Sequence, residues 1–193
     1  GTWATNISWL EDFGAYNRSS LEWDFYAGMK KNFGDSDFFW DVGTLYYYYP
    51  GSKNPGVYSA DSWEVYAAIG WKWVSVKFSY ALEDYFGLRP NGEKTDGSYY
   101  IDLSAAYPVG ETGISLIGHY GYLYVKHDLT GDAKLGYSDW KVGASYTIPE
   151  GVMKGLEIGA YYSGNDAKSA PYTDLNGYDT SKDRGVVYVK KTF

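Results

Sequence analysis

Polar and hydrophobic residues alternate with a period of two along most of the chain. In the segment 21–30 the odd positions are hydrophobic and the even positions are polar, charged or glycine. Successive side chains of a strand point to opposite faces, so this alternation indicates β-strands. The same alternation recurs at 63–72, 76–83, 140–146 and 156–162, whereas helical spacing appears nowhere at comparable length. The pattern therefore predicts an all-β protein.

We expect about ten strands. They fall at roughly 1–10, 21–33, 38–50, 62–73, 74–86, 98–109, 113–127, 138–149, 154–165 and 184–193. These segments exceed the five or six residues usual in soluble sheets. About eleven residues, tilted near 40°, rise roughly 28 Å, which matches the apolar thickness of a bilayer.

The connections between these strands alternate in length. Long polar segments lie at 11–20, 51–61, 87–97, 128–137 and 166–183, and the turns between them, such as 34–37 and 149–153, are short. Outer-membrane barrels have short periplasmic turns and long extracellular loops. We therefore predict one domain over 1–193, a transmembrane antiparallel up-and-down β-barrel with both chain ends on the periplasmic side.

Aromatic residues gather near both ends of the predicted strands, as in the two girdles of membrane barrels. The short-turn end holds Phe33, Phe38, Trp40, Trp71, Trp73, Tyr107 and Phe193. The long-loop end holds Tyr46, Tyr48, Trp63, Phe86, Tyr99, Tyr122, Tyr124, Trp140 and Tyr162. A soluble barrel or sandwich with its apolar face inside is the alternative, because alternation defines two faces without naming the inner one.

The composition removes several classes of protein. The 193 residues include 17 Lys and Arg against 24 Asp and Glu, a formal net charge of −7. Nucleic-acid binding needs a basic face, so this balance argues against it. The absence of Cys excludes disulfides and thiolate chemistry. No apolar run is long enough for a transmembrane helix, and an aromatic content of 20% argues against disorder.

Several segments carry a resemblance to a known family. They are 1–10, 21–26, the run Asp-Val-Gly-Thr-Leu-Tyr-Tyr-Tyr-Tyr-Pro-Gly at 41–51, 107–108 with 111–113, 139–143, and the closing Lys-Thr-Phe at 191–193. With them the chain resembles the TorF-type porins of Gram-negative bacteria, which implies an outer-membrane barrel. Family members carry further N-terminal residues, so the resemblance implies about twelve strands in the full protein. If the chain is complete, we expect 1–10 to pair with 184–193. If it is truncated, we expect that pairing to be absent and both edges to be left for the missing strands.

Catalytic chemistry has little support in the sequence. A serine hydrolase needs a Ser–His pair and a third group that orients the imidazole. Of the two histidines, His119 falls on the polar face and His127 begins a loop. No serine is obviously paired with either, and no Gly-x-Ser-x-Gly motif exists. We predict no enzymatic activity and no cofactor.

Two further features have simple interpretations. The acids of 174–179, with Asp128 and Asp132, do not fit the EF-hand pattern, so we predict solvated loop acids and no metal site. In the run 46–49 we expect Tyr46 and Tyr48 to reach the headgroups. Tyr47 and Tyr49 then face the mouth, where a saccharide could stack on them.

The polar face supplies the predicted pore lining. Its members are Glu22, Asp24, Lys30, Asp41, Glu64, Lys72, Lys77, Glu83, Asp102, His119, Asp139, Lys141, Glu157, Arg184 and Lys190. The acids gather towards the outer mouth, which predicts an interior that favours cations.

We expect passive diffusion of small hydrophilic solutes or ions across the outer membrane of a Gram-negative bacterium. The expected partners are outer-membrane lipid and lipopolysaccharide, with a second copy or another protein bound through the loops. The alternative is a non-conducting structural or interaction barrel whose long extracellular loops bind a partner or a surface. Single-channel conductance separates the two functions.

Overall fold

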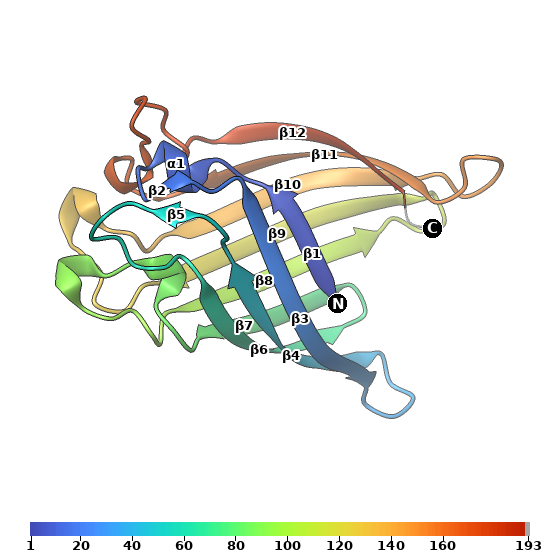
Figure 1. The fold of residues 1–193 in the computed structure, drawn as a ribbon. Coiled ribbons are helices and arrows are strands. Elements are labelled where there is room, and N and C mark those ends of the chain that lie inside the picture. The colour runs from blue at the N-terminus through green and yellow to red at the C-terminus, as the bar shows by residue number, and fades with distance from the viewer. Residues whose placement is uncertain (192–193) are drawn as a thin grey trace.

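The computed structural model describes residues 1–191, and its main element is one curved antiparallel sheet (Figure 1). Ten strands follow one another in the order β1-β3-β4-β6-β7-β8-β9-β10-β11-β12. They are β1 Thr2–Asn6, β3 Leu21–Asn32, β4 Phe38–Tyr48, β6 Ser62–Trp71, β7 Val74–Ala81, β8 Tyr99–Pro108, β9 Ile114–Tyr124, β10 Ser138–Thr147, β11 Leu156–Asn165 and β12 Arg184–Lys191. Each neighbouring pair is antiparallel, which confirms the all-β, up-and-down architecture.

The remaining elements are short and belong to the long connections. They are α1 Trp9–Asp12, the two-stranded sheet of β2 Tyr16–Arg18 and β5 Ser52–Lys53, and the 3₁₀ turns η1 Tyr85–Gly87, η2 Pro90–Gly92, η3 Gly131–Ala133 and η4 Ala170–Tyr172. No helix in residues 1–191 has the length and hydropathy needed to cross a bilayer.

Two predicted strands end earlier than expected. The strand predicted at 1–10 ends at Asn6, because the carbonyl of Ser8 accepts the N–H groups of Glu11 and Asp12 and starts a helical turn. The strand predicted at 74–86 ends at Ala81, and the chain then turns through Phe86 with φ of 49°. Both departures place residues of the long connections over the end of the sheet.

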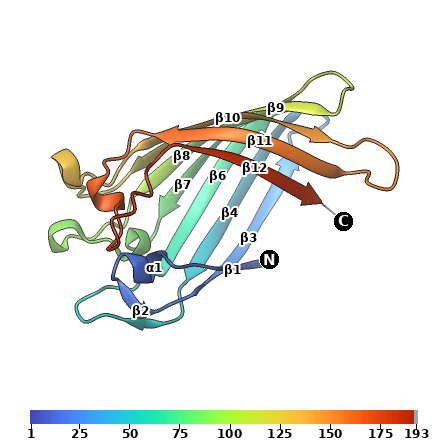
Figure 2. The same ribbon diagram turned by 90° about the horizontal axis from the view of Figure 1, so that it is seen from above.

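The connections are distributed as predicted. Figure 1 shows the long loops with their short helical turns at one end of the sheet and the short turns at the other. The end of β12 lies at the short-turn end, whereas β1 starts near the middle of the sheet, opposite Phe25 and Tyr26 of β3 (Figures 1 and 2). The predicted terminal aromatic, Phe193, lies outside the described residues.

The sheet is not closed within residues 1–191. β1 pairs only with β3, and β12 pairs only with β11, so the predicted pairing of 1–10 with 184–193 is absent and the two edges stand apart (Figure 2). Part of the reason is length, because β1 has 5 residues and β12 has 8. The closed barrel predicted from the sequence is therefore not observed in this part of the chain.

The two faces of the sheet differ as the alternation predicts. Ten apolar side chains at alternate positions of the strands are exposed, from 37% for Val65 to 78% for Val187: Trp23, Phe25, Val65, Ile69, Val76, Phe78, Val142, Ile158, Val187 and Val189. Polar residues on the opposite face are buried, including Asp24, Ser79 and Ser145. Within residues 1–191 the apolar face is therefore the outer face of the curved sheet and does not form its core.

Aromatic belts run along both ends of the outward face. At the short-turn end Trp71 lies 6.3 Å from Phe38 and 6.0 Å from Trp73, whose ring is 5.0 Å from Tyr107. At the long-loop end the contacts include Tyr99 with Tyr124 at 4.8 Å and Trp140 with Tyr162 at 5.6 Å. The positions of these residues agree with the predicted girdles.

Phe86 is the exception among the predicted girdle residues. Its ring centroid lies 5.0 Å from that of Tyr47 and 6.2 Å from that of Tyr49, on the interior side of the sheet. It packs against a small hydrophobic cluster formed by Leu10, Tyr16, Tyr49 and Ala60. We call this assembly the aromatic cap. It covers part of the long-loop end. Phe86 packs inside this cap and is therefore not part of the predicted girdle on the outward face.

Candidate functional site

Tyrosine hydroxyls hold most of the predicted pore-lining carboxylates. Five donate a hydrogen bond to an interior acid: Tyr49 to Glu22 at 2.6 Å, Tyr47 to Glu64 at 3.4 Å, Tyr66 to Asp41 at 3.1 Å, Tyr100 to Asp139 at 2.7 Å and Tyr188 to Glu157 at 2.6 Å. A hydrogen bond fixes a carboxylate in place while leaving its charge uncompensated. The period-two alternation placed these tyrosines on the inner face, but sequence reasoning missed their role as partners of the acids.

Three interior acids form a group near the long-loop end, which we call the acidic group: Glu22, Asp24 and Glu64. Asp24 is only 8% exposed and lies opposite Tyr47 in the register of β3 and β4. Its Oδ1 has no hydrogen-bond partner within residues 1–191. The group therefore brings three carboxyl groups together near the long-loop end of the inner face.

The predicted interior lysines contact aromatic rings. Lys30 Nζ lies 4.0 Å from the Phe39 ring centroid, Lys77 Nζ 5.8 Å from that of Tyr66, and Lys141 Nζ 5.2 Å from that of Tyr161. Lys190 stands opposite Glu157 in the register of β11 and β12. Among the described residues, no Lys or Arg of the interior face lies within 4.0 Å of a carboxylate oxygen.

Two residues predicted to line the interior lie elsewhere. Lys72 is in the tight turn between β6 and β7 with φ of 49°, and its Nζ lies 3.4 Å from Asp37 of the neighbouring turn, so it is at the rim. Glu83 follows the end of β7 and lines a surface depression with Phe25, Tyr46 and Trp63, which are outward-facing residues. Alternation no longer fixes a side chain's face once the strand has ended.

A polar network centres on His119 in β9. Its Nε2 lies 2.9 Å from Asp139 Oδ1 and 3.1 Å from the Tyr100 hydroxyl, and its Nδ1 lies 3.3 Å from Asp102 Oδ2 and 3.1 Å from Ser104 Oγ. Both ring nitrogens thus face carboxylates. A neutral imidazole can donate to only one of them, whereas an imidazolium can donate to both.

Ser104 corrects the expectation that no serine is paired with a histidine. It lies directly opposite His119 in the register of β8 and β9. Register is set by strand pairing across the sheet, and the alternation within one strand does not contain it. The Ser104 hydroxyl nevertheless donates to Asp102 Oδ1 at 2.6 Å. Its proton is therefore directed to a carboxylate and away from the imidazole.

Gly121 makes room for this network. It is opposite both Asp102 and Asp139 in register, and the Tyr100 hydroxyl crosses above it to reach Asp139. A methyl group at Gly121 would collide with the Tyr100 hydroxyl and with Asp139 Oδ2. Glycine is required here because two polar side chains meet over its backbone.

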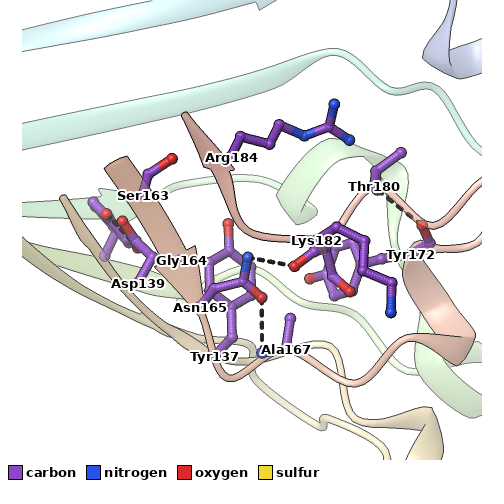
Figure 3. A pocket seen from close by; sticks show the side chains of 12 residues that line it. Tyr137, Asp139, Ser163, Gly164, Asn165, Ala167, Tyr172, Thr180, Lys182 and Arg184 are labelled. Atoms are coloured by element: carbon purple, nitrogen blue, oxygen red, sulfur yellow. Dashed lines mark hydrogen bonds between the residues drawn. The ribbon is translucent and has the colours of Figure 1, made fainter. Parts of the chain in front are cut away.

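A recess of about 400 Å³ adjoins this network at the long-loop end (Figure 3). It lies where β10, β11 and β12 meet the loop 166–183, and we call it the recess. Its wall includes Tyr100, Asp139, Ser163, Tyr172 and Arg184. The recess therefore brings Asp139 and Arg184, both predicted interior residues, to one site.

Five polar residues of the recess already have partners. The Asn165 amide donates to Ser181 O at 2.9 Å and accepts from Ala167 N at 3.0 Å (Figure 3). The Thr180 hydroxyl donates to Tyr172 O, and the Tyr172 hydroxyl donates to Leu135 O. Lys182 Nζ lies 3.1 Å from Asp179. The Ser181 hydroxyl holds the pKa of Asp179 well below its usual range, which keeps that partner ionised.

No group of three or more His, Asp or Glu side chains in residues 1–191 is arranged to hold a metal ion. His127 lies in a loop and its Nδ1 is 2.9 Å from the carbonyl of Lys94. Asp128 accepts the N–H groups of Leu129, Leu135 and Gly136, so it organises its own loop.

The fold and the site together define an all-β protein of up-and-down strands with a charged, tyrosine-lined inner face. The chain belongs to the Gcw_chp family, whose description is "bacterial protein of unknown function" and whose model matches residues 1–193. No curated protein matches the chain. The porin activity implied by the resemblance to TorF-type porins stays a prediction.

Proposed function

We propose that this protein is an outer-membrane β-barrel that lets small hydrophilic solutes and ions, preferentially cations, diffuse passively. One observation carries the proposal: the large apolar residues of the sheet lie exposed on its outward face while the ionisable residues lie on the inner face. Contiguous exposed apolar surface marks a lipid or protein interface. The two aromatic belts that border it favour lipid.

A bilayer requires that the edges of the sheet be paired. Backbone N–H and C=O groups left unpaired in lipid cost several kcal/mol each. β1 and β12 run in opposite directions, so they can pair directly or through an even number of further antiparallel strands. We propose that the edges are joined in one of these ways in the membrane, which gives the closed barrel predicted from the sequence.

The inner face supports a preference for cations. Within residues 1–191, the acids hydrogen-bonded by tyrosines have no Lys or Arg nitrogen within 4.0 Å of their oxygens. The acidic group adds its charge near the long-loop end. Fixed charge of one sign between low-dielectric walls concentrates counter-ions and repels ions of the same sign.

The contact between Ser104 and His119 raises hydrolysis as a second function, and three details argue against it. The serine hydroxyl donates to Asp102. The network lies on the inner face, away from lipid substrates. The N–H groups of the surrounding strands are engaged in the ladder of β8, β9 and β10, which leaves no pair of donors for an oxyanion.

Recording currents through the purified protein in a planar bilayer tests the proposal. We expect discrete conductance steps and, in a KCl gradient, a reversal potential on the side of K⁺ selectivity. Absence of conductance from folded, inserted protein would favour the non-conducting barrel. Anion selectivity would overturn the assigned role of the acids.

A further inference from the structure

The recess has an excess of hydrogen-bond donors. Its other polar groups have internal partners, as described above. The groups left are the Arg184 guanidinium and the hydroxyls of Ser163 and Tyr137, none of which has a side-chain hydrogen bond or ion pair within residues 1–191. Both oxygens of Asp139 already accept hydrogen bonds or contact His119. The hydrogen-bond donors of the recess that have no partner would therefore suit a ligand that accepts hydrogen bonds.

Two of these donors, Ser163 and Arg184, stand at one level of the wall. Ser163 is directly opposite Arg184 in the register of β11 and β12 and directly opposite Lys141 in the register of β10 and β11. Ser163 faces inward, because Glu157 and Tyr161 share its parity on β11. Two cationic side chains thus flank one hydroxyl along a row across three strands.

The acids near this row are directed elsewhere. Asp183 precedes Arg184 but accepts from Tyr162 at 3.3 Å on the outward side. Asp166 accepts the N–H of Ser138 at 2.6 Å, and Asp179 binds Lys182. The Arg184 guanidinium lies 5.2 Å from the Tyr178 ring, which packs one region of the group and leaves its N–H donors available.

Tyr137 adds a neutral donor beside an aromatic wall. Burial, with a smaller contribution from Asp139, raises the pKa of its hydroxyl above the usual value, so the hydroxyl keeps its proton. Its ring meets that of Tyr172 edge to face at 5.6 Å. The carbon skeleton of an organic ligand can pack against these rings while its anionic group contacts the donors.

We propose that the recess binds a small organic monocarboxylate, with its carboxylate held by Arg184, Ser163 and Tyr137. The planar guanidinium matches the geometry of a carboxylate. A volume of about 400 Å³ suits a solute of the size of a sugar acid. The inference goes beyond the proposed function, because it assigns a local anion-binding site and not the ion preference of the interior.

Saturation-transfer NMR on the purified full chain, folded in detergent, tests the inference without requiring conduction. The probes are D-glucuronate, neutral D-glucose and inorganic phosphate. We expect glucuronate to bind, and glucose and phosphate to bind at least about tenfold more weakly, because one lacks the charge and the other lacks a body that contacts the tyrosines. Equal binding of glucose or of phosphate, or no binding of glucuronate, would overturn the proposal.

Variants locate the binding. R184Q should raise the Kd of glucuronate at least about tenfold, and R184K should give an intermediate value because it keeps charge but loses the planar fork. The matched control is R18Q, which removes an exposed arginine from β2, outside the recess. Circular dichroism checks that each variant is folded. An unchanged Kd in folded R184Q would overturn the assignment.

The two proposals fail separately. Binding of glucuronate by a protein that shows no conductance would contradict the diffusion function and leave the recess assigned. Conductance without glucuronate binding would support the diffusion function and contradict the assignment of the recess.

Discussion

Tyrosine hydroxyls and carboxylates are matched across the strands of the inner face. Four of the five pairs join adjacent strands, and the fifth, between Tyr100 and Asp139, crosses β9 at Gly121. Each hydroxyl fixes the position of an acid without neutralising it. The matching explains how a chain with so many inward tyrosines can still present charge to the interior.

Of the glycines in β9, Gly121 should be the one at which an added methyl group lowers the unfolding free energy most. In G121A the methyl group collides with the Tyr100 hydroxyl and Asp139, so we expect a loss of about 1–3 kcal/mol in unfolding free energy. Urea titration in detergent measures it. G118A is the matched control, because a methyl group at Gly118 meets nothing within 4 Å. Equal effects of the two substitutions would contradict the role given to Gly121.

Tyr137 should ionise later than an ordinary tyrosine. Because its pKa is raised, the proton stays on the folded protein through about pH 10, the range in which an exposed tyrosine loses it. Stability linked to this group is present below that pH and falls as the pH rises through the raised pKa. Near-ultraviolet absorbance of tyrosinate, compared between wild type and Y137F, measures it. A difference signal at or below pH 10 would contradict the burial argument.

The strands themselves were predictable where alternation runs through a paired segment. β3 at Leu21–Asn32 and β6 at Ser62–Trp71 lie within a residue or two of the predicted ranges. The ends of β1 and β7 were wrong, because hydrogen bonds of the connections decide where pairing stops. Glu83 was misplaced for the same reason. Local pattern thus defines faces, and tertiary contacts define lengths.

Ile69, near mid-height of β6, tests the outward face. I69R should lower the unfolding free energy in lipid vesicles by about 2–4 kcal/mol, because it places a charge on the lipid-facing side. V152R is the control, since Val152 is fully exposed in the turn between β10 and β11, outside the apolar band. Similar values for the two variants would show that the outward face does not contact hydrocarbon.

At the scale of the molecule, alternation, loop asymmetry and aromatic positions were enough to predict the up-and-down sheet and which of its faces points outward. The His119 network was not predictable. Ser104, His119 and Asp139 come from three strands, and only the pairing register brings them together. The recess was hidden for a similar reason, because its wall combines residues of β8, β10, β11 and β12 with the loop 166–183.

Glu64 and Glu83 make a matched pair for ion selectivity. E64Q removes a charge from the inner face, so we expect a smaller cation preference, most visibly at low salt where screening is weak. E83Q removes the same charge from the outward side and should change selectivity less. Reversal potentials in KCl gradients measure both. A larger shift for E83Q would contradict the assignment of these faces.

The aromatic cap makes the two openings of the molecule unequal. Phe86 and its neighbours fill the long-loop end beside β3 and β4, while the short-turn end has only tight turns. In the proposed barrel, the loops at the long-loop end therefore limit the size of the solutes that can pass, and the number of strands does not. Polyethylene glycols of graded mass, added to one side of a bilayer at a time, should enter further from the short-turn side. The molecule would then act as an asymmetric sieve whose cutoff depends on the direction of approach.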